Sequence, residues 1–287
     1  MTDAKITSST VRDDFNSIEA VLHYTRAAHS LGLWESERIL IERFFTDRSA
    51  PLLEAGCGAG RATLGLWNLG YRNLTAFDFA EELLEQAQSL AVERGASAIR
   101  FLLADATRLG KCHLLSDIPS ETKDGRLELC HLLGEKLPEL GAVITSVAPR
   151  FSGALFLFNG LMQIPDRENR RAALGELHRA CRVDAPLIFT THDRNDSPEE
   201  AECWAGERER WAAGLQESHL VEFGDRYMES TDGRIFMHLP DQTEIREDLA
   251  ATGWVPEYTA MRREIARESR AVRAFSDECR FWVAKRG

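Results

Sequence analysis

A glycine-rich turn constrains the fold of this chain more than any other feature of its sequence. The turn reads Leu53-Glu54-Ala55-Gly56-Cys57-Gly58-Ala59-Gly60-Arg61, with apolar strand-like residues before it and a helix-forming segment after it. Glycine has no Cβ, so such a turn can take a positive φ angle and a ligand can approach its backbone closely. The first N–H groups of the following helix favour a polar or negatively charged ligand group. The turn therefore predicts a nucleotide-type cofactor site at the first β–α junction of an open α/β sheet.

Two further predicted strands end in acidic residues. Residues 74–79 place Asp78 at a strand end, and residues 98–105 end in Asp105. A carboxylate at the position of Asp78 can accept hydrogen bonds from both ribose hydroxyls, and Phe79 beside it can pack against a base. One such aspartate alone is more often a helix cap or turn residue. An ordered set of three strand-end signals in a β-α-β-α-β pattern instead predicts one nucleoside site.

The glycine spacing separates two kinds of cofactor. A G-x-G-x-x-G pattern with a later acid is typical of the dinucleotide sites of nicotinamide-dependent dehydrogenases. Here the spacing is G-x-G-x-G after Glu54, which resembles motif I of the class I S-adenosylmethionine (SAM)-dependent methyltransferases. The resemblance rests on motifs over residues 45–110 and continues by pattern alone over 150–287. It implies a Rossmann-like, doubly wound α/β sheet with the strand order 3-2-1-4-5-7-6, the seventh strand being antiparallel.

The same resemblance implies SAM as methyl donor and S-adenosylhomocysteine as product. It implies that Asp105 binds the exocyclic amine of adenine and that the Ala106 N–H meets a ring nitrogen. Asn159 ends the predicted fourth strand, where these enzymes face the transferring methyl group, although an asparagine there can also simply cap a loop. The predicted cofactor-binding residues are Glu54, Gly56, Cys57, Gly58, Gly60, Asp78, Phe79, Asp105, Ala106 and Asn159.

The sequence around Asn159 bears on the acceptor. Enzymes that methylate the amino groups of nucleobases or glutamine often carry an Asn/Asp-Pro-Pro-aromatic motif at this strand end. The chain has Asn-Gly-Leu-Met at 159–162, which argues against that branch. The net charge of −11 also disfavours nucleic acid as the main partner, because a phosphate backbone attracts clustered lysines and arginines. We therefore expect a small-molecule acceptor and no nucleic acid.

Other features of the sequence predict the compartment. The chain has no run of 18 apolar residues, so we expect no membrane span. Its first residues lack the apolar core of a secretory signal. Six cysteines in 287 residues do not form a dense disulfide scaffold, which favours reduced thiols in a cytoplasmic protein. The Cys-His pairs at 112–113 and 130–131 match no common zinc spacing, so no metal site is predicted.

The chain divides into a helical cap and a cofactor-binding domain. Residues 1–14 are polar and predicted to be loose, and a broken helical pattern follows to residue 45. Tyr24 and Trp34 in this pattern are candidates to lie near the cofactor cleft, or to serve simple packing. The predicted units are a cap over 1–45 and a methyltransferase domain over 46–287, with an insertion at 111–150 and a substrate cap at 196–240. The insertion is equally compatible with a lid and with a plain surface excursion.

Three residues are candidates for acid–base chemistry. His192 follows the predicted fifth strand, and its ordinary pKa near 6.5 suits a general base. Asp193 could orient that imidazole or bind a substrate amine, and His238 on a predicted hairpin is a second candidate base. His192 and Asp193 are equally compatible with an ordinary polar turn after a strand. In-line methyl displacement needs a base only where the nucleophile carries its proton, as a hydroxyl does.

The sequence thus favours a methyltransferase that acts on a small molecule. The alternatives are a protein or RNA methyltransferase and a non-catalytic SAM-binding regulatory subunit. The first of these would need a basic stripe or a recognition module, which is not visible in the sequence. Intact glycines and acids predict ligand binding in the regulatory case as well.

Overall fold

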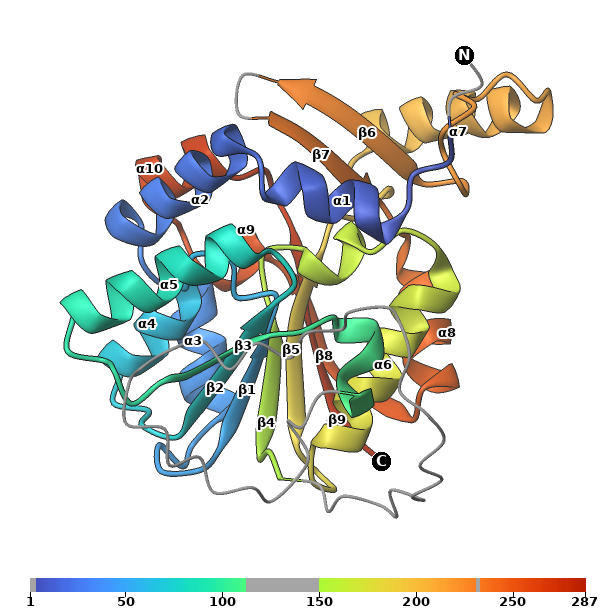
Figure 1. Cartoon of the computed structure of the whole chain (residues 1–287). Helices are drawn as coiled ribbons and strands as arrows, with labels where there is room; N and C mark the ends of the chain where they lie inside the picture. Colours follow the sequence, from blue (N-terminus) through green and yellow to red (C-terminus); the bar gives the residue numbers. More distant parts are fainter. Residues whose placement is uncertain (1–3, 112–149, 231–232) are drawn as a thin grey trace, which may run out of the picture.

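The computed structural model describes residues 4–111, 150–230 and 233–287. Its centre is a seven-stranded sheet in the order β3-β2-β1-β4-β5-β9-β8 (Figure 1). The strands from β1 to β5 pair in parallel, whereas β9 runs antiparallel to both β5 and β8. This confirms the expected order 3-2-1-4-5-7-6. The strands are β1 Leu52–Ala55, β2 Leu74–Asp78, β3 Arg100–Leu103, β4 Gly153–Phe156, β5 Pro186–Thr191, β8 Trp254–Met261 and β9 Arg280–Arg286.

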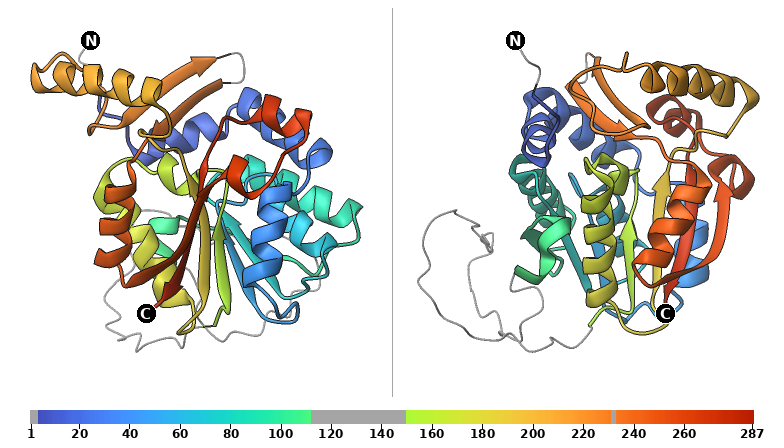
Figure 2. Two further views of the ribbon diagram at one scale, coloured as in Figure 1. Left: turned by 180° about the vertical axis from the view of Figure 1, so that it is seen from behind. Right: turned by 90° about the vertical axis from the view of Figure 1, so that its right-hand side faces the viewer.

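The inner strands β1, β2, β4 and β5 are buried along their whole length because helices cover both faces of the sheet. Side chains alternate between the faces, so Leu52 joins one hydrophobic core and its neighbour Leu53 the other. Helices α3, α4 and α5 close the first core, and α6, α8 and η1 the second (Figures 1 and 2). Their bounds are α3 Glu35–Phe44, α4 Arg61–Asn68, α5 Glu81–Glu93, η1 Ala106–Lys111, α6 Arg167–Ala180 and α8 Gln242–Ala251.

A third group of elements gathers at one end of the sheet, at the carboxyl ends of the parallel strands (Figure 1). The antiparallel pairing of β6 with β7 confirms the predicted hairpin, while residues 231 and 232 of its Asp-Gly signal lie outside the described residues. No helix in the described part of the chain is long and apolar enough to cross a membrane. The elements of this end are α1 Ser8–Phe15, α2 Ile18–Ser30, η3 Gly160–Gln163, α7 Pro198–Ala212, β6 Asp225–Ser230, β7 Gly233–His238, α9 Arg262–Ile265 and α10 Arg270–Phe275.

The prediction of a loose segment over 1–14 is wrong from residue 8 onward, where α1 forms. Thr7 accepts a hydrogen bond from the Thr10 N–H at 3.3 Å and caps the helix. Val11 and Phe15, four positions apart, bury their side chains on one face of it. Two apolar residues in a polar stretch are a weak periodic signal, which is why the sequence pattern missed this helix.

The insertion predicted at 111–150 lies outside the described residues from 112 to 149, together with both of its Cys-His pairs. Its two ends are the end of η1 and the start of the segment that leads into β4. The substrate cap predicted at 196–240 corresponds in the structure to α7 and the hairpin β6–β7.

Two glycines offer a matched test of packing in the sheet. A Cβ on Gly153, in the central strand β4, would lie 2.3 Å from the buried Phe45 ring, whereas one on Gly175 in α6 would meet only Arg179 at 3.8 Å. We expect Gly153→Ala to lower the free energy of unfolding by about 1–3 kcal/mol through overpacking. Gly175→Ala should raise it by roughly 0.5–1 kcal/mol. Urea unfolding monitored by circular dichroism measures both, and equal effects would contradict the packing described here.

Candidate functional site

The glycine turn between β1 and α4 is bound to the neighbouring strand β2. The Cys57 N–H donates to the Phe77 carbonyl at 3.0 Å, and the Gly58 N–H donates to Asp78 Oδ2 at 2.7 Å. Gly56 and Gly58 have φ angles of +60° and +52°, which side chains rarely tolerate. A Cβ on Gly56 would lie 2.7 Å from the Phe156 ring, but a Cβ on Gly58 would project into open space. The turn therefore leaves room for a ligand above Gly58.

Asp78 is a buried acceptor at the tip of β2. Its Oδ2 takes the Gly58 hydrogen bond, and its Oδ1 takes one from the Ala80 N–H at 2.9 Å. Burial raises the pKa of Asp78, and these backbone donors partly oppose that shift. A carboxylate oxygen has more than one acceptor site, so Asp78 can bind ligand hydroxyls while it holds the turn.

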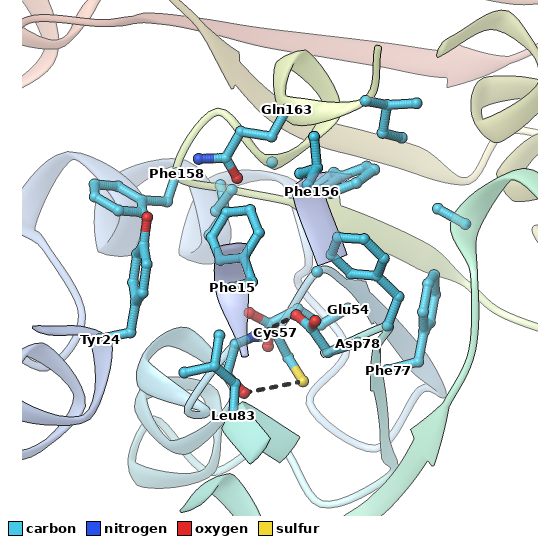
Figure 3. Close-up of a pocket in the computed structure, with 18 of the residues that line it drawn as sticks. Phe15, Tyr24, Glu54, Cys57, Phe77, Asp78, Leu83, Phe156, Phe158 and Gln163 are labelled. Carbon is cyan, nitrogen blue, oxygen red and sulfur yellow. Dashed lines mark hydrogen bonds between the residues drawn. The ribbon is translucent and has the colours of Figure 1, made fainter. Parts of the chain in front are cut away.

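A pocket opens over this turn and encloses about 1040 Å³ of empty space, part of it open to solvent. Like most small-molecule sites, it is concave and lined mainly by apolar and aromatic side chains, with a few polar groups among them. Figure 3 shows Glu54, Cys57 and Asp78 on its floor, with aromatic rings around it. Eight of the predicted cofactor-binding residues line it, namely Glu54, Gly56, Cys57, Gly58, Asp78, Phe79, Asp105 and Ala106.

Gly60 and Asn159 are not among the described residues that line the pocket. Gly60 is the N-cap of α4, with a φ angle of +81°, and a Cβ on it would lie 3.1 Å from the side chain of Ala87. It therefore allows α4 and α5 to pack closely. Asn159 is buried one position behind Phe158, which does line the pocket.

Two buried groups under the turn have unusual surroundings. Glu54 Oε2 accepts a hydrogen bond from Thr63 Oγ1 at 2.5 Å. Burial raises the pKa of Glu54 to about 7, with the Thr63 hydrogen bond acting in the opposite direction. Burial also raises the pKa of the Cys57 thiol well above its ordinary value. Cys57 is therefore protonated and unreactive at neutral pH.

Arg61 brings a positive charge to the pocket, and the sequence pattern did not identify it. Its two Nη atoms donate to the Glu37 carboxylate at 2.7 and 2.6 Å, and one also donates to the Gly32 carbonyl. The guanidinium lies 4.5 Å from the centre of the Trp34 ring. Trp34 itself is buried, which fits the packing interpretation, whereas Tyr24 lines the pocket.

Aromatic side chains form the wall opposite the carboxylates. Phe158 stacks on Phe275 with ring centroids 5.6 Å apart, and Tyr24 meets Phe158 edge-on at 6.0 Å. Phe158 and Asn159 take left-handed φ angles of +54° and +59° at the end of β4. Burial raises the pKa of Tyr24 to about 12, although a side-chain hydrogen bond with Gln163 opposes the shift. Tyr24 is therefore a neutral phenol at physiological pH.

His192 lies behind the pocket wall, outside the described lining. Its Nδ1 is 3.0 Å from the Glu278 carbonyl, which can only accept, so the proton sits on Nδ1. Its Nε2 then accepts from the Asn159 side-chain amide at 3.1 Å. Burial lowers the pKa of His192, which keeps the ring neutral. Both ring nitrogens are thus already bonded within the protein.

Asp193 also has partners inside the protein. Its Oδ2 accepts from Arg280 Nε at 2.8 Å and from the Gln242 amide at 3.1 Å. Its Oδ1 accepts from the Asn195 N–H at 3.0 Å. Asp193 is buried and joins β5 to β9 and to the start of α8, and the described pocket lining does not include it.

His238 is fully buried at the end of β7, away from the pocket. Its Nδ1 lies 2.9 Å from Asp225 Oδ1, and its Nε2 lies 2.7 Å from Glu244 Oε1. Burial alone lowers the pKa of His238, but the two carboxylates outweigh it and raise the pKa. Asp225 and Glu222 lie within 4.8 Å of the ring as possible metal ligands. Arg170 binds Glu222 at 2.8 Å, so these groups form a compensated ion network.

Comparison with known proteins supports one family. Residues 52–115 match the model of the methyltransferase domain family. These residues belong to a methyltransferase domain. The fold is that of the class I SAM-dependent methyltransferases, in which ligands bind at the carboxyl ends of the parallel strands. No curated protein matches the sequence significantly.

Three solved structures illustrate the shared fold. A SAM-dependent methyltransferase from Methanosarcina mazei has 16% identity and a TM-score of 0.57, covering 89% of this chain and 98% of its own. The (4+2)-cyclase SpnF has 15% identity and a TM-score of 0.58, with 100% and 99% coverage. A Burkholderia thailandensis 1,6-didemethyltoxoflavin-N1-methyltransferase, with bound acceptor and S-adenosylhomocysteine, has 17% identity and a TM-score of 0.52, with 99% and 92% coverage.

The residues of the pocket fit SAM. The open space above Gly58 leaves the backbone approachable, as a nucleotide-type ligand requires. Asp78 and Asp105 lie at the ends of adjacent strands and supply acceptors for hydroxyl and amino groups. Carboxylates on the pocket floor also suit a ligand that carries a positive charge.

Glu54 yields a pH-dependent prediction. Its pKa rises from 4.5 to about 7 on folding, so its stabilising contribution is complete below about pH 4.5 and is lost as pH rises through 7. Relative to Glu54→Gln, the wild type should lose roughly 3 kcal/mol of unfolding free energy across that interval. Denaturant unfolding at a series of pH values measures the difference. For the exposed control Glu93→Gln, the difference in unfolding free energy from the wild type should not change with pH. A difference that is also independent of pH for Glu54→Gln would contradict the assignment.

Proposed function

We propose that this protein transfers the methyl group of SAM to a small-molecule acceptor bound in the same pocket. The observation that carries the proposal is the single pocket in which carboxylates at two strand ends face an aromatic wall. SAM supplies an electrophilic methyl group that needs no further activation. The protein's contribution is to bind both molecules in line and to exclude water.

The cofactor half of the site is assigned to the motif residues. Asp78 binds the ribose hydroxyls, Phe79 packs against the adenine, and Asp105 with the Ala106 N–H binds its polar edge. Gly56, Cys57 and Gly58 form the bend around the amino-acid end, with Glu54 beneath it. The location of eight predicted residues in one pocket lining supports this assignment. Gly60 and Asn159 contribute indirectly, by shaping α4 and the tip of β4.

We propose that His192 acts as a positioning residue. Its Nε2 holds the side chain of Asn159 at the tip of β4, next to Phe158. Asp193 and His238 have comparable structural partners, in Arg280 and in the Asp225–Glu244 pair. These contacts favour a site in which shape, more than acid–base chemistry, determines the rate.

A pH profile tests the role of His192. As a positioning residue, its replacement in His192→Gln should lower kcat but keep the shape of the kcat–pH profile between about pH 5 and 8. A general base would instead lose the acidic limb of that profile on substitution. Loss of that limb in the variant would therefore contradict the positioning role.

A small-molecule acceptor is favoured over a protein or RNA. Arg61 is the one arginine or lysine among the described residues that line the pocket, and Glu37 already pairs with it. The neighbour described as a 1,6-didemethyltoxoflavin-N1-methyltransferase holds its acceptor and S-adenosylhomocysteine in the same fold.

The described cysteines Cys57, Cys181, Cys203 and Cys279 are unpaired thiols. They support a cytoplasmic location.

Radiolabelled SAM tests the activity. The full-length protein is incubated with methyl-labelled SAM and a fractionated metabolite extract, and label is followed into small molecules, protein and RNA. Label in a small-molecule fraction supports the proposal. Label only in protein or RNA supports the other methyltransferase alternative, and binding without transfer supports a regulatory subunit. The neighbour described as a cyclase makes this test necessary, because the fold alone does not determine the reaction.

Asp78→Ala should weaken SAM binding by about 1.5–3 kcal/mol, because it removes a charged acceptor from two hydroxyls and releases the glycine turn. Titration calorimetry with S-adenosylhomocysteine measures the loss directly. Asp47→Ala is the matched control, since Asp47 is exposed and precedes the opposite end of β1. Unchanged affinity in Asp78→Ala would contradict the proposed cofactor position.

A further inference from the structure

Three aromatic rings from three separate elements form one continuous stack beside the cofactor half of the pocket. His23 on α2 stacks on Phe275 of α10, with centroids 4.6 Å apart and planes inclined by 18°. Phe275 in turn stacks on Phe158, with centroids 5.6 Å apart and an inclination of 19°. Two nearly parallel contacts in series align the rings, and the stack extends from the pocket toward the surface of the protein.

Phe275 separates the pocket from a second hollow. This hollow lies between α2 and α10 and encloses about 560 Å³, part of it open to solvent. Phe275 and Ala27 line both spaces. Small side chains, including Ala271 and Ala274, line the rest of the α10 side of the hollow. Phe275 and Ala27 therefore lie between this outer hollow and the inner pocket.

The backbone is strained at Phe158 and Asn159, just after β4. Both Phe158 and Asn159 have positive φ angles, a conformation that is uncommon for asparagine and a clear outlier for a bulky residue such as phenylalanine. Strained residues of this kind persist only where their surroundings hold them, and they cluster at functional sites. Here the Asn159 N–H donates to Thr190 Oγ1 at 2.7 Å, and Tyr24 packs edge-on against the Phe158 ring.

We infer that Phe158, Phe275 and Tyr24 form the acceptor subsite and select a flat, uncharged aromatic ring that carries a hydroxyl or similar polar group. Phe158 and Phe275 are partly buried and line the pocket, so the edges of their rings can contact an aromatic acceptor, and aromatic pairs gain attraction beyond simple burial. The Tyr24 phenol and the Gln163 amide supply the polar contacts. Of the charged lining residues, Glu54, Asp78 and Asp105 belong to the proposed cofactor half. Arg61 lies 5.8 Å from the centre of the Phe158 ring, but its charge is already paired with Glu37.

This inference rests on the proposed function only for the position of the acceptor beside SAM. The probe pair is 2-naphthol and its saturated analogue decahydro-2-naphthol, titrated into the full-length protein with and without S-adenosylhomocysteine. We expect 2-naphthol to bind about tenfold more tightly than the saturated alcohol. S-adenosylhomocysteine that fails to bind contradicts the proposed function. Equal affinities for the two alcohols overturn the aromatic subsite, whether or not the nucleoside binds.

Variants locate the preference within the structure. Phe158→Leu and Phe275→Leu should each lower the affinity for 2-naphthol about fivefold or more and leave that for decahydro-2-naphthol unchanged. The control Phe44→Leu, whose ring packs against Tyr258 and Arg43 away from the pocket, should change neither. An aromatic preference that survives both pocket variants overturns the assignment.

Tyr24→Phe provides a second test that keeps the packing of the ring. This substitution removes only the hydroxyl group, so the fold is preserved even if Phe158→Leu and Phe275→Leu are unstable. The variant should bind 2-naphthol several-fold more weakly than the wild type and should bind naphthalene with unchanged affinity. Equal effects on the two probes would remove Tyr24 from the subsite. Tighter binding of a cationic ring such as N-methylquinolinium than of 2-naphthol would contradict the selection of an uncharged ring.

Discussion

The hydrogen bond from the Gly58 N–H to Asp78 connects the two elements on which the rest of the site depends. It holds the turn after β1 against the tip of β2, so the bend and the acceptor keep a fixed separation before any ligand binds. The strand pairing beneath it sets the same register, with Ala55 opposite Phe77. A preorganised site of this kind avoids the cost of ordering the loop when the ligand arrives.

A second constraint holds the hairpin β6–β7 in place beside that site. Arg170 is fully buried on α6 and pairs with Glu222 and Glu244, while His238 bridges Asp225 and Glu244. The charges alternate in sign, so each buried ion has a compensating neighbour. Burial would raise the pKa of Glu244, yet His238 and the nearby arginines lower it to about 2. The network therefore ties the hairpin β6–β7 to α6 and α8 throughout the neutral pH range.

The sequence predicted the part of the site that depends on local pattern. The glycine spacing and the strand-end acids Asp78 and Asp105 are short-range signals, and the strand order follows from the fold they indicate. Tyr24 could be placed near the cleft only as one of two alternatives. Phe158 and Phe275 could not be predicted, because their contact joins residues more than 100 positions apart. No propensity rule anticipates a left-handed phenylalanine at a strand end.

His192 and His238 show the opposite difficulty, since a histidine in the sequence suggests chemistry wherever it occurs. His192 contacts a backbone carbonyl and the Asn159 amide, and His238 contacts two carboxylates. The ring nitrogens of both histidines are therefore already hydrogen-bonded within the protein. What distinguishes this pocket is its division into a charged floor and an aromatic wall. We propose that this floor stabilises a positively charged methyl donor and that the wall excludes water from the reacting atoms. Because the transfer disperses positive charge, a dry apolar wall beside the methyl group favours the transition state over the ground state.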